Sequence, residues 1–438
     1  MIKVKSLYVC QQCGYKSPNW LGKCPNCSSW NSFVETVTPS TKFGSTRPRN
    51  ANAGPKKLSE VEKIKLGRIP TGLVEFDRVL GTSNAFSGVV PGSVVLVAGD
   101  PGIGKSTLLL QTAAKIGGLY VAGEESAEQV KIRAERIKGN FDELFILSET
   151  DVDLIIEAIR SKEYRFVVID SIQTLVTGDL DGSAGSVGQV RECANRLHRL
   201  AKENNLPIFV IGHVTKEGAV AGPRVLEHLV DAVIYLEGER YHSFRILRSI
   251  KNRFGPTAEI GIFEMTDKGM VEVANPSALF LEERGEGAGS IVVPTMEGSR
   301  PVLTEIQALT SPVSFGLPRR TGSGVDYNRL QLLVAVLTRR AGLNLQNQDI
   351  FVNVAGGLKI FEPAADLAIC LSIASSVLDK SISSGAVAIG EVGLLGEVRR
   401  VGNMEKRIAE AKKLGFNKFI TPDQAKTLKE ALNLAFKA

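Results

Sequence analysis

The chain has 438 residues, more than the roughly 250–300 at which a single hydrophobic core stops growing, so we expect two or three folded units. Hydrophobic residues make up 43% and charged residues 23%, which excludes collagen-like, coiled-coil and wholly disordered proteins. The net charge of +6 permits a polyanionic partner without requiring one. Every apolar run is too short to span a bilayer, and the first residues lack the apolar core of a secretion signal. We therefore expect a cytoplasmic protein with no membrane partner.

Residues 1–34 hold four of the six cysteines, arranged as two Cys-x-x-Cys pairs that are separated by ten residues. This spacing lets four thiolates surround one ion. It predicts a structural four-cysteine zinc finger, because four sulfur ligands leave zinc no open position for catalysis. The expected ligands are Cys10, Cys13, Cys24 and Cys27. The only two tryptophans, Trp20 and Trp30, lie in the same segment, where they either form its small core or stack on unpaired nucleobases.

Residues 35–57 are expected to form a flexible basic linker. From Thr36 to Lys57 the chain has three prolines and five basic residues but no acid. Such a segment can bury too little apolar surface to fold by itself. It serves either as a solubilising tether or as a transient contact for phosphates.

Residues 58–275 alternate apolar, strand-like runs with amphipathic helical runs, a pattern typical of an α/β fold with parallel strands and crossover helices. The strands are expected at Ser93–Ala98, Leu119–Ala122, Leu144–Leu147, Phe166–Ile169 and Ile208–Ile211. The helices are expected at Thr107–Ile116, Ala127–Ile137, Val152–Ser161 and Val187–Asn204. Because the strands are almost wholly apolar, the sheet should be covered on both faces. Further strand-like runs between residues 232 and 273 predict a hairpin-like addition to it.

Residues 276–438 are numerous enough to sustain a core of their own, and they mix strand and helix patterns as an α+β domain does. The clearest elements are strands at Ser290–Pro294 and Val302–Leu309 and helices at Tyr327–Ala341 and Ala364–Val377.

A phosphate-binding loop follows the first apolar strand of the α/β section. The segment Gly99-Asp-Pro-Gly-Ile-Gly-Lys-Ser106 matches G-x-x-x-x-G-K-[ST], between a strand and a helix as the motif requires. Its backbone amides and the helix N-terminus attract phosphate, Lys105 reaches the outer phosphates, and Ser106 is a ligand for Mg²⁺. The residues expected to bind ATP here are Gly99, Asp100, Pro101, Gly102, Ile103, Gly104, Lys105, Ser106 and Thr107.

Acidic and polar residues at the ends of other strands complete the predicted nucleotide site. Asp170 ends an apolar strand and should hold Mg²⁺, directly or through water. Glu124 and Glu125 follow another strand, where either can activate the attacking water; alternatively they favour the dipole of the next helix. His213 follows a third strand and either senses the γ-phosphate or caps the strand.

This order of motifs resembles the RecA-like P-loop NTPase core. Together with Lys251-Asn-Arg-Phe-Gly255, the four-cysteine finger and the C-terminal section, it is similar to the RadA (Sms) family of bacterial DNA-repair proteins. The resemblance implies a DNA-dependent ATPase and translocase that uses ATP and Mg²⁺ and acts in stress responses. It implies activity on recombination intermediates by branch migration. The implied partners are single-stranded and branched DNA and the RecA recombinase, and the implied assembly is a hexameric ring.

The resemblance also places further residues. Residues 178–188 and 216–224 correspond to loops that face the channel of RecA-like rings, with Lys216 and Arg224 as candidate phosphate contacts. Lys251 and Arg253 lie two apart on an extended segment and so point the same way. They act either on the γ-phosphate of a neighbouring subunit, as catalytic arginine-finger residues do, or on DNA phosphates, unless they form an ordinary solvated pair.

The C-terminal section resembles the proteolytic domain of Lon but lacks its catalytic residues. Ala364 stands at the nucleophile position and Glu405 at the position of the lysine base. We therefore expect a proteolytically inactive, Lon-protease-like domain that serves as a scaffold or a DNA-binding surface. Its basic candidates for DNA are Arg319, Arg320, Arg339, Arg340, Arg399 and Arg400. Two other functions remain open at this point, a KaiC-like signalling ATPase and an ATP-dependent protease.

Overall fold

The computed structural model describes residues 5–38, 57, 67–83, 86–137, 139–213, 223–238, 243–282, 284–285, 287–313 and 316–436. The chain forms two compact units. The first comprises Met1–Gly238, Ser243–Thr257 and Phe263–Glu272, and the second comprises Glu239–His242, Ala258–Ile262 and Val273–Ala438. Most of the expected linker, residues 39–56, lies outside the described residues.

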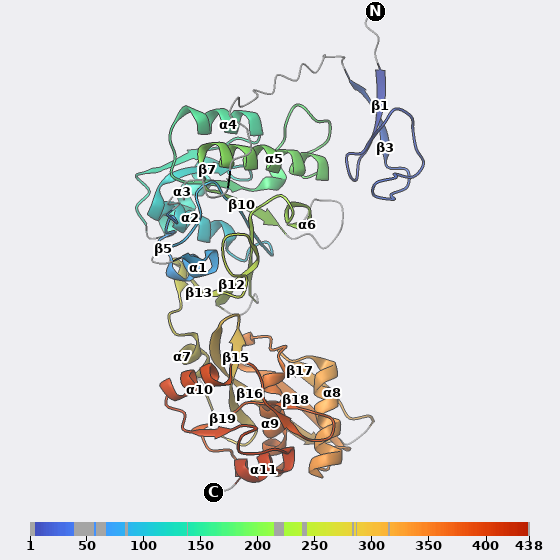
Figure 1. The fold of residues 1–438 in the computed structure, drawn as a ribbon, viewed down its shortest axis with the longest axis vertical. Coiled ribbons are helices and arrows are strands. Elements are labelled where there is room, and N and C mark those ends of the chain that lie inside the picture. Colours follow the sequence, from blue (N-terminus) through green and yellow to red (C-terminus); the bar gives the residue numbers. More distant parts are fainter. Residues whose placement is uncertain are drawn as a thin grey trace, which may run out of the picture. The chain divides into compact units, whose positions relative to one another are not determined.

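The N-terminal segment folds into a small antiparallel sheet (Figure 1). Its strands, in the order β2-β1-β3, are β1 (Lys5–Cys10), β2 (Lys16–Ser17) and β3 (Phe33–Thr38). The buried residues of its core are Cys10, Cys24 and Phe33. A core of three side chains is too small to stabilise a fold without a metal or a cross-link.

A nine-stranded sheet forms the centre of the first unit, in the order β14-β13-β12-β11-β6-β10-β9-β7-β8. The strands from β8 to β11 in this order are parallel, whereas β12 pairs with β11, and β14 with β13, in antiparallel fashion. The hairpin-like addition therefore begins after β11. The strands are β6 (Val94–Gly99), β7 (Gly118–Ala122), β8 (Leu144–Leu147), β9 (Val167–Asp170), β10 (Ile208–His213), β11 (Ala232–Glu237), β12 (Phe244–Asn252), β13 (Ile260–Thr266) and β14 (Gly269–Glu272).

Helices cover both faces of this sheet, which is why its central strands are apolar along their whole length (Figure 1). Successive residues of β6 point to opposite faces, so Val95 and Val97 pack with α1–α3 while Leu96 packs with α4 and α5. The helices are α1 (Val74–Leu80), α2 (Lys105–Ile116), α3 (Ala127–Arg136), α4 (Val152–Ser161), α5 (Val187–Asn204) and the short α6 (Pro223–Leu226). A 3₁₀ turn, η2 (Ile172–Thr174), follows β9, and a two-stranded ribbon of β4 (Thr82–Ser83) and β5 (Phe86–Ser87) follows α1.

The second unit is an α+β domain built on a six-stranded sheet in the order β17-β18-β16-β15-β19-β22. Its strands are β15 (Ser290–Glu297), β16 (Arg300–Pro312), β17 (Arg320–Ser323), β18 (Gln348–Val354), β19 (Ala386–Ala388) and β22 (Lys418–Ile420), with a separate ribbon of β20 (Glu391–Val392) and β21 (Val398–Arg399). Its helices are α7 (Pro276–Leu281), α8 (Tyr327–Val336), α9 (Asp366–Leu378), α10 (Met404–Lys413) and α11 (Leu428–Phe436). The helix expected over 327–341 ends in a π turn, Leu337–Ala341. Among the described residues, no helix is long and apolar enough to cross a membrane.

Candidate functional site

The loop between β6 and α2 has the geometry of a phosphate cradle. Gly99, Gly102 and Gly104 have φ values of 152°, 78° and 111°. A Cβ at Gly99 would lie 2.4 Å from the carbonyl oxygen of Leu236 in β11, so the neighbouring strand requires glycine there. Gly104 precedes α2 and provides no side-chain cap, which leaves the first amides of the helix available to an anion.

The ammonium of Lys105 folds back over this loop. Its Nζ donates hydrogen bonds to the carbonyl oxygens of Gly99 (2.9 Å) and Asp100 (3.0 Å), and the residue is buried. Burial lowers the pKa of Lys105, and the nearby carboxylates of Asp170, Asp100 and Glu124 partly oppose that shift. A buried cation held only by carbonyl oxygens fits a role as a partner for phosphate oxygens.

Asp170 ends β9 beside the loop, opposite Ala122 of β7 in the strand register. The hydroxyl of the buried Tyr120 donates a hydrogen bond to Asp170 Oδ2. Burial, followed by the charge of Asp170, raises the pKa of Tyr120 well above its usual value, so this tyrosine remains a donor. Tyr120 is not among the predicted site residues, although a hydroxyl in an otherwise apolar strand, two residues before its end, is a usable signal. This bond fixes the Asp170 carboxylate at the end of β9, and its role as a ligand for Mg²⁺ together with Ser106, at the start of α2, stays a prediction.

Glu124 and Glu125 point to different partners. The Ser171 hydroxyl donates a hydrogen bond to Glu124 Oε1, and His213 Nε2 lies 3.2 Å from the same oxygen. Glu125 instead forms an ion pair with Arg133 of α3. The structure therefore brings Glu124, Ser171 and His213 together where β7, β9 and β10 end, and it directs Glu125 toward the helix.

Helix α3 has its own cap, which bears on the alternative interpretation of these glutamates. Ser126 is the N-cap residue and forms a capping box with Gln129, so the backbone amides of both residues already have partners. Glu124 precedes this cap and is not needed to begin the helix. Its role at the nucleotide stays a prediction.

Lys251 and Arg253 lie at the opposite end of the strands from the phosphate loop. Asn252 pairs with Ala232 at the start of β11, and β11 runs parallel to β6, whose far end leads into the loop. Lys251 Nζ donates to the carbonyl oxygens of Glu227 (2.6 Å) and Val230 (2.8 Å). The half-exposed Arg253 lies 3.5 Å from Asp231. The structure does not bring these residues to the nucleotide site of their own chain.

The two predicted channel loops differ in what the structure describes. The segment 178–188 is anchored: Arg196 pairs with Asp179, and Gln189 donates to the carbonyl oxygens of Leu180 and Gly182. Most of the second loop, including Lys216, lies outside the described residues, as does the side chain of Arg224.

The four N-terminal thiols converge on one point. Their sulfurs all lie within 4.8 Å of one another, with 3.6 Å between Cys10 and Cys27 and 3.5 Å between Cys13 and Cys24. The hydroxyl and amide of Ser29 lower the pKa of Cys27 to about 6, which favours the thiolate form. Four sulfurs at this spacing fit tetrahedral zinc.

The two tryptophans of this module are not part of its core. Trp20 is 52% and Trp30 71% exposed, whereas Cys10, Cys24 and Phe33 fill the interior. The interpretation of the indoles as core residues is therefore wrong, because the metal-ligating cysteines take the few interior positions that so small a unit has.

In the C-terminal unit, the two positions that are expected to correspond to Lon's catalytic residues have different environments. Ala364 is buried and has no nucleophilic group, while the side chain of Glu405 is 81% exposed and pairs with Arg400. A cavity of about 270 Å³ nearby is lined by the ion pair between Arg329 and Asp366. None of the lining residues carries a hydroxyl, thiol or amine that could serve as a nucleophile, and the proteolytic inactivity of this unit stays a prediction.

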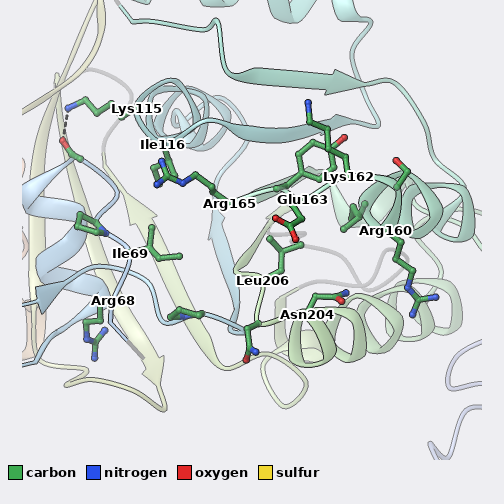
Figure 2. A pocket seen from close by; sticks show the side chains of 17 residues that line it. Arg68, Ile69, Lys115, Ile116, Arg160, Lys162, Glu163, Arg165, Asn204 and Leu206 are labelled. Carbon is green, nitrogen blue, oxygen red and sulfur yellow. Dashed lines mark hydrogen bonds between the residues drawn. The ribbon is translucent and has the colours of Figure 1, made fainter. Parts of the chain in front are cut away.

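A cavity of about 970 Å³ lies on the amino-end side of the central sheet, away from the phosphate loop (Figure 2). Pro91, Arg165 and Leu206, which shortly precede β6, β9 and β10, contribute to its walls. Two of its cations already have protein partners: Lys115 donates to the carbonyl oxygen of Gly72, and Arg160 pairs with Glu203. We do not assign the nucleotide to this cavity.

The fold and the two sites define an ATPase of the RecA-like P-loop class that carries a four-cysteine zinc ribbon. Family models match in three places: an AAA domain over residues 82–219, a rubredoxin metal-binding domain over 8–35, and subunit ChlI of Mg-chelatase over 325–425. These matches agree with an ATP- and Mg²⁺-binding core, a zinc ribbon and a Lon-like C-terminal fold.

Curated relatives match over nearly the whole chain. The DNA repair protein RadA of Bacillus subtilis is 53% identical, with 96% of this chain and 93% of the relative covered. That of Listeria monocytogenes is 54% identical, with coverages of 95% and 91%. That of Streptococcus pyogenes serotype M1 is 53% identical, with coverages of 97% and 94%. The chain belongs to the RadA family of DNA repair proteins, and its P-loop unit is the ATPase of that family.

Proposed function

We propose that the chain is a DNA-stimulated ATPase that translocates on single-stranded and branched DNA and promotes branch migration of recombination intermediates. The observation that carries this proposal is the position of Glu124. This carboxylate contacts Ser171 and His213 at the ends of β9 and β10. Loss of the γ-phosphate can therefore shift the segments that follow both strands. Those segments correspond to the loops that contact DNA in RecA-like rings.

The site's own residues suggest how ATP is hydrolysed. Amides of the phosphate loop and Lys105 bind the phosphates, while Ser106 and Asp170 hold Mg²⁺, which supplies further positive charge against them. Glu124 orients the attacking water and accepts its proton, and the γ-phosphoryl group leaves ADP as phosphate. His213, 3.2 Å from Glu124, responds to the loss of that group and passes the change into the chain beyond β10.

The position of Lys251 and Arg253 in the sheet supports the proposed ring. Both residues lie at the end of the strands that is remote from the phosphate loop of their own chain. They can therefore assist hydrolysis only at the nucleotide site of another copy. A head-to-tail arrangement of copies closes into a ring when the rotation between them allows it. The hexameric state, the partnership with the RecA recombinase and the role in stress responses follow from the family resemblance.

The test is the steady-state ATPase rate of the full chain with and without single-stranded DNA at fixed salt. We expect the DNA to raise the rate several-fold. A rate that is the same with and without DNA would contradict the proposal and favour an ATPase that acts without nucleic acid, such as a KaiC-like signalling protein.

A further inference from the structure

The exposure of the two tryptophans in the zinc ribbon needs an explanation outside the fold. An indole left in water forgoes the burial that makes tryptophan stabilising in a core. Here both are exposed, whereas the buried apolar cluster among the described residues of the unit consists of Cys10, Cys24 and Phe33. Neither indole is therefore placed by the needs of folding.

The two indoles lie beside each other. A Cβ built on Gly22 would be 3.7 Å from the Trp20 ring and 4.0 Å from the Trp30 ring, so both rings border the same small residue. The Nζ of Lys23 lies 5.6 Å from the centre of the Trp30 ring. We call Trp20, Trp30 and Lys23 the aromatic surface. It combines two flat π faces with a cation.

We propose that the aromatic surface binds unpaired nucleobases of single-stranded DNA by stacking. Stacking on aromatic rings is tolerant of sequence because every base has a π face, and cations beside the rings attract the phosphates. The sequence that follows the ribbon adds five basic residues and no acid between Thr36 and Lys57, which complements a polyanion. The proposal rests on the proposed function for the identity of the polymer.

A protein partner is the less favoured occupant. A stable protein interface buries about 800 Å² on each partner around an apolar centre. The exposed large apolar side chains among the described residues of the ribbon are Tyr15, Trp20, Trp30 and Val34. Among their neighbours along the chain, Leu21 packs against the core, whereas Pro18, Asn19 and Gly22 offer little apolar surface. Such a surface suits one or two bases better than the centre of a protein interface.

The sequence makes the first test direct, because Trp20 and Trp30 are the only tryptophans of the chain and report all indole fluorescence. The full-length protein is titrated with oligothymidylate, with a duplex, and with an abasic strand of equal length and charge. We expect oligothymidylate to quench the fluorescence. The duplex and the abasic strand should leave it nearly unchanged, because they offer phosphates without accessible bases.

The second test uses variants whose zinc content is first shown to be one ion per chain. Trp20→Ala and Trp30→Ala should each weaken binding of single-stranded DNA about tenfold, and Trp→Phe at the same positions should restore most of the loss. The dependence of binding on salt should be unchanged in these variants. Lys23→Ala should instead reduce the salt slope, because it removes a phosphate contact. Phe361→Ala, at a 79% exposed aromatic residue of the second unit, is the matched control.

Equal quenching by the abasic strand, or binding by both alanine variants that matches wild type, would overturn the proposal. Quenching by a protein such as the recombinase and not by oligothymidylate would assign the surface to a protein partner instead. The DNA-stimulated ATPase rate separates the two proposals. If stimulation persists in the tryptophan variants while quenching fails in wild type, the stacking proposal fails and the proposed function stands.

Discussion

Arg253 offers the sharpest test of how the nucleotide site is completed. Its side chain is 54% exposed and lies 3.5 Å from Asp231, whose carboxylate also accepts from the Val94 amide (3.1 Å) and from Lys202 (3.0 Å). Exposed pairs of this kind contribute about 0–1 kcal/mol. Arg253→Ala should therefore lower the free energy of unfolding by less than about 1 kcal/mol, because Asp231 keeps its other partners.

The effect on catalysis should be far larger. An arginine finger supplied by a neighbouring subunit accelerates hydrolysis by about 10³-fold or more. We expect Arg253→Ala to reduce kcat by about that factor in assembled protein and to leave the affinity for ATP nearly unchanged. The assay is steady-state hydrolysis above the assembly concentration, with nucleotide binding measured separately. Arg136→Ala, at an exposed position near the end of α3, is the matched control.

Mixing two inactive variants tests the contribution in trans. Arg253→Ala subunits retain the phosphate loop, and Lys105→Ala subunits retain the arginine, so mixed assemblies contain some complete sites and should regain part of the activity. Failure to regain activity, or an equal loss of ATP binding in Arg253→Ala, would refute the reasoning. Unchanged hydrolysis combined with weaker DNA binding would assign Arg253 to DNA phosphates instead.

Three further changes test the remaining parts of the site. Glu124→Gln should lower kcat at least 100-fold while ATP still binds. Glu125→Gln loses only the ion pair with Arg133 and should lower kcat less than tenfold. Similar rates for the two variants would contradict the assignment of Glu124 as the base. Tyr120→Phe removes the hydrogen-bond donor to the buried Asp170 and should lower the free energy of unfolding by about 1–3 kcal/mol, measured by thermal melting. The variant should also need more Mg²⁺ for half-maximal ATPase activity. An unchanged Mg²⁺ titration would argue against the role of Asp170. Cys10→Ser should abolish zinc binding and expose residues 1–34 to protease while the P-loop unit melts as before; retention of one zinc per chain would exclude the four-sulfur site.

The P-loop unit could be predicted closely from sequence because its signals are local. Each residue of β6 faces one of two covered layers, so the strand is apolar throughout, and the loop motif follows at once. Helix α5 begins and ends at Val187 and Asn204 as expected, since it has a clear amphipathic pattern and ends before Asn205 in a left-handed conformation. The convergence of four sulfurs also follows from spacing alone.

What could not be predicted depends on contacts between distant residues. The remote position of Arg253 follows from the register of β12 on β11 and of β11 on β6, which no short motif encodes. Glu124 and Glu125 have different partners because Ser171 follows β9 whereas Arg133 belongs to α3, and no local pattern shows that these two residues approach. The exposure of Trp20 and Trp30 depends on which side chains fill the interior of the ribbon, and hydrophobicity alone suggests the opposite.

The central claim is that ATP bound at the loop of Lys105 drives movement along DNA. The most direct measurement follows a labelled strand in a three-strand branched DNA during incubation with the full-length protein and ATP. The account predicts ATP-dependent displacement of that strand by the wild-type chain, and none by a Lys105→Ala variant that melts at the same temperature. Equal displacement by the variant, or by the wild type without ATP, would contradict it.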